Sequence, residues 1–367
     1  MSVTTLALAV GAYLSLIFAL ALLVDRRPRS SSMLIPQSWI YALSIAVYCT
    51  SWTFYGSVGR SAASGLGFIP VYIGPLLVFI FAQPFLRKLI AVSKTQHLTS
   101  ITGLIAARYG KRQLLAGLVT LIAVLGVVPY IALQLKAVAS TFELLSATSG
   151  TLIPIERNLS LHNDTAFFVA LLMGFFVIAF GTRRIDATEQ HRGMVAAIAF
   201  ESVVKLLAFL LVGVFVTYQL YDGFGDVLLR AQARPELAPL LDLGQSLRDP
   251  SFWSLTALSA LVIFCLPRQF QVTVVENTDP AHLRQAAWIF PAYLVAINLF
   301  VLPIAMAGLM QAPGFGGNPD NFVLTLPLGA GQGWIALVVL IGGLAAATGM
   351  IIVETIALST MISNDLV

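Results

Sequence analysis

The sequence has little charge for its length. Asp, Glu, Lys and Arg together make up 10% of its 367 residues, whereas hydrophobic residues make up 58%. A soluble globular domain carries about 25% charged residues, so the composition argues against a large soluble protein. The net charge is only +4, and the basic residues lie in short loops between apolar segments, which does not favour a nucleic-acid-binding protein. The composition predicts an integral membrane protein.

Cysteine and histidine are also scarce, with two and four residues in the chain. Cys49 and Cys265 lie within apolar segments and form neither a metal-ligand spacing nor a disulfide framework. The histidines lie in predicted loops and match no metal site and no phosphoacceptor motif of a kinase. The sequence also has no glycine-rich lid for ATP. We therefore expect no metal, no cofactor and no catalytic residue within these residues.

The sequence is rich in long apolar runs. A helix needs about 20 apolar residues to cross a bilayer core. The sequence predicts nine such segments, over residues 3–24, 37–58, 66–86, 113–145, 165–182, 192–221, 251–276, 285–310 and 333–362. The first segment is followed, not preceded, by its positive charges, which is the reverse of a signal peptide and predicts a retained helix.

The distribution of basic residues predicts the orientation of the chain. Most Lys and Arg residues lie in the loops that follow odd-numbered segments, and such loops face the cytoplasm. We therefore expect a multi-pass protein of a bacterial inner membrane with a periplasmic N-terminus. Because Val367 follows the ninth segment directly, we also expect the chain to be the N-terminal part of a longer protein.

The longer loops carry weaker patterns. Three of them, near 146–164, 222–250 and 311–332, fall on the predicted periplasmic side. The loop over 222–250 is amphipathic and is expected to lie on the membrane surface, whereas 311–332 is rich in turn residues. On the cytoplasmic side, residues 93–109 predict a short amphipathic helix beside the membrane.

Several stretches carry a family likeness. Residues 42–56, 67–75, 99–110 and 130–135 read ALSIAVYCTSWTFYG, GFIPVYIGP, TSITGLIAARYG and YIALQL. These stretches resemble the sodium:solute symporter family, in the branch of the sodium/proline symporters. The likeness extends over essentially the whole chain but stops short of that family's usual number of helices.

A narrower likeness lies further along the chain. Residues 266–280 and 300–305 read LPRQFQVTVVENTDP and FVLPIA. They resemble the symporter-like N-terminal region of CbrA-type sensor histidine kinases, in which cytoplasmic sensor and kinase domains follow the transporter-like domain.

The resemblance implies an all-α, LeuT-like bundle of two inverted repeats behind one extra helix. Residues 1–367 would form a single transporter-like membrane domain that lacks the last helices of the second repeat, with no kinase domain. The implied function is the binding, and possible uptake, of a small amino acid, with histidine as a first candidate. The parent protein would be a kinase acting on a response regulator. The alternatives are a plain secondary transporter of the symporter family and a receptor that does not transport.

In a LeuT-like fold the solute lies near the midplane, where two helices are broken. The candidate breaks are near residues 51–56 and around Pro267, which removes a backbone donor and disfavours helix at the preceding residue. Alternatively, Pro267 ends the seventh helix at the cytoplasmic face. The candidate solute-binding residues are Cys49, Thr50, Ser51, Trp52, Gln134 and Pro267.

The same resemblance implies a sodium site between the second and ninth helices, and here the chain departs from it. Cys49 stands where the family has an acidic residue, and Gly349 and Met350 stand where it has hydroxyl residues. A thiol is a poor ligand for a hard cation, which prefers oxygen. We therefore expect weak or absent sodium coupling, with proton-coupled or passive transport, or sensing alone, as alternatives. Thr348 is adjacent to Gly349 and would supply one oxygen if the alignment with the family is shifted by one residue.

Ionisable residues inside membrane segments are functional candidates. Glu201 and Lys205 lie one turn apart and share a face, so they either neutralise each other or form a relay for protons or solute. Glu354 is a candidate protonatable group or one half of an internal salt bridge. Arg268 and Glu276 flank the predicted cytoplasmic end of the seventh segment, as a hydrated helix end or as a gate that signals the transporter's state.

Overall fold

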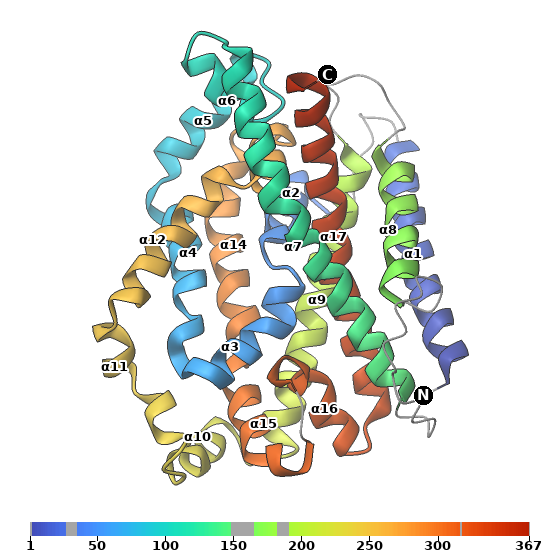
Figure 1. Cartoon of the computed structure of the whole chain (residues 1–367), viewed down its shortest axis with the longest axis vertical. Coiled ribbons are helices and arrows are strands. Elements are labelled where there is room, and N and C mark those ends of the chain that lie inside the picture. Colours follow the sequence, from blue (N-terminus) through green and yellow to red (C-terminus); the bar gives the residue numbers. More distant parts are fainter. Residues whose placement is uncertain (1, 27–34, 148–164, 182–190, 316–317, 367) are drawn as a thin grey trace.

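The computed structural model describes residues 2–26, 35–147, 165–181, 191–315 and 318–366. Within these ranges the chain forms helices and no strand, and the long helices lie side by side along one axis (Figure 1). Five of them are long and apolar enough to cross a membrane, and two bent pairs could each add one span. The predicted all-α class is confirmed.

Five of the predicted segments form uninterrupted helices, and their bounds agree with the predictions to within a few residues. They are α1 (Val3–Arg26), α7 (Gln113–Ala147), α8 (Thr165–Gly181), α9 (Arg192–Tyr218) and α17 (Gly333–Asp365). α17 packs against both α9 and α7, and 83% of its most apolar stretch is buried. A helix that is apolar on all sides belongs in the interior, and the structure places α17 at the centre of the bundle.

The other four predicted segments are interrupted. The second consists of α2 (Gln37–Ser44), the 3-10 turn η1 (Ile45–Tyr48), the π-helical turn η2 (Trp52–Gly56) and α3 (Ser57–Ser64). The third consists of the 3-10 turn η3 (Gly65–Phe68), α4 (Pro70–Phe81) and α5 (Gln83–Thr95). The seventh consists of α12 (Pro250–Cys265), α13 (Pro267–Phe270) and the π-helical turn η6 (Gln271–Val275), and the eighth of α14 (His282–Asn298) and α15 (Val301–Phe315).

The bend at Pro267 decides between the two interpretations of that residue. The helix axis turns by 58° between α12 and the segment Pro267–Val275, and the chain then continues as helix. Pro267 therefore breaks the seventh segment rather than ending it.

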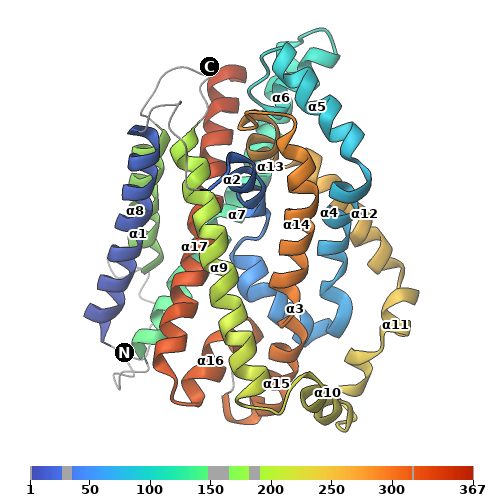
Figure 2. The same cartoon turned by 180° about the vertical axis from the view of Figure 1, so that it is seen from behind.

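Close helix packing holds the interrupted segments in place. α4 and α12 pack directly on each other, and a Cβ at Gly74 would overlap Ser259 Oγ and backbone atoms of α12. Figure 2 shows α14 between α9 and α4, and α14 contacts both of them as well as α2. The broken second segment thus packs against α14 and α9.

The predicted loops contain further helices. In the 222–250 loop, α10 (Phe224–Gln232) packs against α15 and buries Val227 and Ala231. Val227 and Ala231 therefore face protein, whereas Leu229 stays exposed, and the membrane-surface position of this loop stays a prediction. The loop continues through η5 (Ala238–Leu241) and α11 (Leu243–Arg248).

The turn-rich 311–332 loop contains η7 (Pro319–Asn321) and α16 (Phe322–Gly329), which packs against α17 and α15. The helix predicted over 93–109 is split into the end of α5 and α6 (Ile101–Arg108), because Ser100 starts a new helix by accepting a hydrogen bond from Gly103 N. Most of the 146–164 loop lies outside the described residues.

Candidate functional site

The break in the second segment leaves backbone groups without helical partners. Cys49 is extended (φ −80°, ψ 99°), and helix resumes only after Thr50. The predicted break at 51–56 is thus displaced, because residues 52–56 form a π-helical turn and the chain opens before them. Carbonyls at the end of one half-helix and N–H groups at the start of the next must find other partners.

The N-terminal end of the second half-helix is satisfied by α7. Ser51 N and Ser51 Oγ both donate to Gln134 Oε1, at 3.0 and 2.6 Å. The hydroxyls of Thr50 and Tyr130 are 2.8 Å apart. Three predicted solute-binding residues, Thr50, Ser51 and Gln134, are therefore brought together, and Gln134 caps the helix that begins at Ser51.

The C-terminal end of the first half-helix is satisfied by α9. Lys205 Nζ donates to Ala46 O at 2.8 Å and to Cys49 O at 2.6 Å, and Lys205 is only 3% exposed. Cys49 is buried as well. It therefore contributes its carbonyl oxygen to the site through the contact with Lys205.

Glu201 lies one turn before Lys205 on α9 but reaches a different neighbour. Its Oε1 accepts a short hydrogen bond from Thr348 Oγ1 of α17. A Cβ at Gly349 would lie 2.5 Å from Glu201 Oε2, so the glycine makes room for the carboxylate. Glu201 and Lys205, both within the described residues, form no direct ion pair. Each side chain instead forms its hydrogen bonds with a separate helix, and the relay for protons or solute stays a prediction.

The second break lies at Leu266, which is extended (φ −74°, ψ 129°). Arg268 follows it, and its Nη1 donates to Glu354 Oε2 at 2.7 Å. The side chains of Arg268 and Glu354 are 4% and 0% exposed. The Arg268 guanidinium also lies 5.1 Å from the centre of the Tyr130 ring.

This geometry settles two open questions. Arg268 was predicted at a hydrated or gating end of the seventh segment, and that placement is wrong because helix continues past Pro267 and keeps residue 268 inside the bundle. Of the two alternatives for Glu354, the structure shows the internal salt bridge, with Arg268 as its partner.

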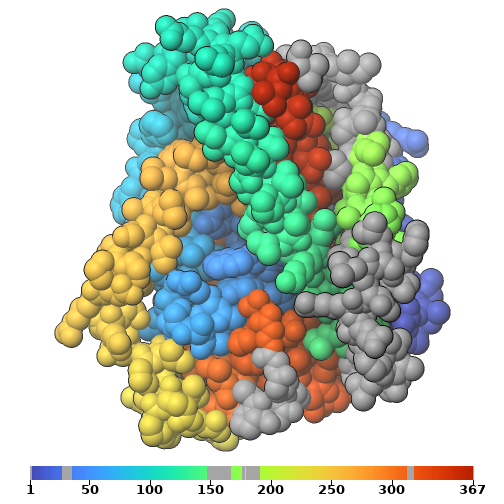
Figure 3. Space-filling view, viewed as in Figure 1, coloured from blue at the N-terminus to red at the C-terminus, as the bar shows by residue number. Residues whose placement is uncertain are grey.

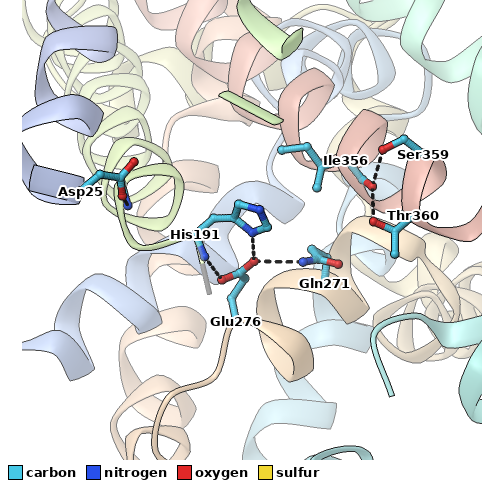
Figure 4. Close-up of polar contacts among 8 residues, drawn as sticks. Asp25, His191, Gln271, Glu276, Ile356, Ser359 and Thr360 are labelled. Carbon is cyan, nitrogen blue, oxygen red and sulfur yellow. Dashed lines mark hydrogen bonds and ion pairs between the residues drawn. The ribbon is translucent and has the colours of Figure 1, made fainter. Parts of the chain in front are cut away.

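Glu276 lies at the true end of the seventh segment and is also buried. Its Oε1 lies 2.9 Å from His191 Nδ1 and accepts from Gln271 Nε2 at 3.0 Å, while its Oε2 accepts from His191 N at 2.9 Å. We refer to Glu276, His191 and Gln271 as the Glu276 cluster. Figure 4 shows it close to α17, where Ser359 and Thr360 donate to Ile356 O. The cluster ties the end of η6 to the start of α9.

Two cavities adjoin the breaks, and Trp52 and Tyr130 line both. The larger, of about 620 Å³, has mostly apolar walls from α7 and α12, and Pro267 and Arg268 lie at its edge. The smaller, of about 190 Å³, is more polar and is lined by residues that include Ser51, Gln134, Lys136 and Asp320. In Figure 3 the surface between α7 and α12 is visible on the face toward the viewer. Trp52 thus lines a cavity, as its position beside the break predicts.

Two residues of this region were missed in the sequence. Tyr130 lies one turn before Gln134 on α7, and that spacing puts both on one face, so the signal was present. Asp320 lies in a turn-rich loop, and nothing in the sequence places it near α7. Partial burial raises the pKa of the Asp320 carboxyl above its ordinary value.

Comparisons with known proteins address the fold. A solved structure of a Na+-coupled sialic acid symporter, in a substrate-bound outward-open state, matches 98% of this chain and 74% of its own, with a TM-score of 0.66 and 16% identity. The chain has the fold of a symporter. The predicted LeuT-like, multi-pass architecture is therefore confirmed.

At the level of sequence, no family model matches the chain. The uncharacterized symporter YhjB of Bacillus subtilis (strain 168) is 26% identical over 315 residues, which cover 84% of this chain and 59% of YhjB. The chain thus spans less than two thirds of the length of that relative. Neither match supports the narrower resemblance to sensor kinases.

Proposed function

We propose that the chain is the solute-binding membrane region of a secondary transporter, the plain-transporter alternative raised from the sequence. The observation that carries this proposal is the convergence of two broken helices, interrupted at Cys49 and Leu266, on cavities lined by Trp52 and Tyr130. In transporters with discontinuous helices, solute and ions bind where such breaks meet. The similarity to YhjB, a symporter by name, supports the same conclusion.

The solute we propose is a small amino acid, with histidine as the first to test. Arg268 lies at the edge of the larger cavity, and its Nε has no hydrogen-bond partner among the described residues. Arginine carries five N–H donors, so donors remain for a carboxylate after the bond to Glu354. The rings of Trp52 and Tyr130 would enclose the rest of a small solute.

We further infer that transport is not coupled to sodium. Cys49, Gly349 and Met350 supply no hard side-chain oxygen, and Thr348, which donates to Glu201, leaves a single hydroxyl oxygen where a hard cation requires several. A proton is the alternative coupling ion. Glu201 is our candidate carrier, because it is buried and its Oε2 has no hydrogen-bond partner among the described residues, whereas Glu354 is paired with Arg268.

The Glu276 cluster is our candidate gate at the predicted cytoplasmic end. Opening there would separate η6 from the start of α9 and break the contacts of Glu276 with His191. Bound solute would shift the balance between states only through a difference in affinity for them. Glu276→Gln, which weakens the cluster, should increase hydrogen exchange over residues 271–276 relative to an Asp279→Asn control.

The sensor-kinase interpretation, including its response regulator, stays a prediction, as do the inner-membrane location and the periplasmic N-terminus. An immunoblot that measures the size of the native protein tests the sensor-kinase interpretation. A band far larger than a symporter would support fused signalling domains, and a symporter-sized band would exclude them.

Cys265 offers a direct test of the proposed binding site. It is exposed and lines the larger cavity, whereas the other cysteine, Cys49, is buried. A panel of amino acids is screened for slower alkylation of Cys265 and for uptake by cells that express the full-length protein, with Cys265→Ser as the labelling control. Protection and uptake by the same amino acid would support the proposal. If no amino acid slows the alkylation of Cys265 and none is taken up, the proposal is refuted.

A further inference from the structure

The environment of Lys205 is that of a cation site. In transporters with broken helices, unwound carbonyls and the C-terminal ends of half-helices coordinate the coupling cation. Ala46 O and Cys49 O are the carbonyls at such an end, and both accept hydrogen bonds from Lys205 Nζ, at 2.8 and 2.6 Å. A positive charge therefore already occupies the position to which these carbonyls would attract a free ion.

A lysine near the C-terminal end of a helix is common, because it offsets the negative end of the helix dipole. Such lysines usually lie at exposed ends, whereas Lys205 is 3% exposed and comes from the middle of another membrane helix. Charge at this depth is expensive and is found mainly where it has a function. Burial and the origin from α9 both set Lys205 apart from an ordinary cap.

The surrounding side chains do not supply a separate ion site. A hard cation requires several oxygen ligands, and Cys49, Gly349 and Met350 provide none from their side chains. Thr348 donates to Glu201 and offers only one hydroxyl oxygen. Sodium thus does not fit the residues present as long as Lys205 holds the two carbonyls.

Glu201 completes the arrangement. It lies one turn from Lys205 on α9 and carries the opposite charge, while its bond from Thr348 joins α9 to α17. Lys205 in turn joins α9 to the broken second segment. The two side chains together connect three helices, which is the structural role that a bound cation and its ligands would otherwise have.

We propose that the Lys205 ammonium is a tethered cation that takes the place of a bound sodium ion at the break of the second segment. This deepens the proposed function, since it explains how a symporter fold could work without sodium. Its test requires only folded protein and salts, so a failure of the transport proposal would leave the test intact.

The experiment measures thermal unfolding of the purified full-length protein in detergent, in equal concentrations of sodium chloride and choline chloride. It compares the wild type with Lys205→Ala and with Lys88→Ala, a control that removes an exposed lysine of α5 away from both cavities. For the wild type and for Lys88→Ala, we expect the melting temperature in sodium chloride to equal that in choline chloride. Lys205→Ala should melt several degrees lower in choline and recover much of that loss in sodium, because the freed carbonyls can then bind the ion.

Three results would overturn the proposal. They are stabilisation of the wild type by sodium over choline, a Lys205→Ala variant as stable as the wild type in choline, and a destabilised Lys205→Ala variant that sodium does not rescue. If Lys205→Ala does not fold, Lys205→Gln replaces it, since its amide keeps a donor without the charge. The same sodium rescue is then expected, and the same three results would refute the idea.

Discussion

The buried ion pair between Arg268 and Glu354 gives the most quantitative prediction. Glu354→Gln keeps the size of the side chain but leaves the guanidinium without a counter-charge in the interior. Breaking a buried pair by removing one partner costs about 3 to 5 kcal/mol. The side chains are 4% and 0% exposed, so solvent screening, which makes surface pairs weak, has little effect here.

The double variant separates the pair from its surroundings. Arg268→Met combined with Glu354→Gln removes both charges, and such a replacement is often close to neutral. We therefore expect the double variant to be more stable than Glu354→Gln alone, despite carrying one more substitution. The contact of Arg268 with the Tyr130 ring, 5.1 Å away, is lost both in the double variant and in the single variant Arg268→Met.

The assay is a double-mutant cycle, with the free energy of unfolding measured in mixed micelles by titration with a denaturing detergent. Contacting residues in one network show coupling energies of about 0.5 to 3 kcal/mol. If the effects of the two single substitutions simply add, the residues are not coupled and the assignment of this pair is refuted.

Three further predictions address other contacts. Gln134→Leu removes the acceptor for Ser51 N and Ser51 Oγ and should cost about 1 to 3 kcal/mol of folding free energy, measured by the same titration. Gly349→Ala should lower the rate of solute uptake, because the added methyl group displaces Glu201. Burial raises the pKa of the Asp320 carboxyl above 3.8, so the folded state holds the carboxyl proton more tightly than the unfolded state. The stability therefore falls as the pH rises from 3.8 through the pKa of Asp320 in the folded state. Asp320→Asn should flatten this dependence in thermal unfolding.

Matched variants control for each of these. Gln134→Glu keeps an acceptor oxygen and should be less destabilising than Gln134→Leu. Gly11→Ala adds a methyl group where nothing lies within 4 Å and should leave uptake unchanged. Equal effects within either pair, or an unchanged pH dependence in Asp320→Asn, would contradict the contacts described.

The sequence predicted the elements that depend on local chemistry. Apolar run length located the membrane segments, and the missing N–H of Pro267 located one break. The other break, at Cys49, has neither proline nor glycine, and its position was therefore predicted slightly too late. The break there is held open by partners from α7 and α9, which a local pattern does not reveal.

The partners of buried charges were the least predictable feature. Glu354 was recognised as a residue that needs a partner, but Arg268 was placed at a helix end. Likewise, Lys205 was paired with Glu201 because they share a face of one helix. Long side chains on a common face can extend to different helices, and only the tertiary arrangement decides which contacts they make.

Uptake by proteoliposomes that contain the full-length protein tests the central claim most directly. The solute is the amino acid that protects Cys265, and its uptake is compared between sodium chloride and choline chloride, with the same salt on both sides of the membrane. The account predicts equal uptake in the two salts, because the Lys205 ammonium already serves as the cation. Uptake that strictly requires sodium would contradict it.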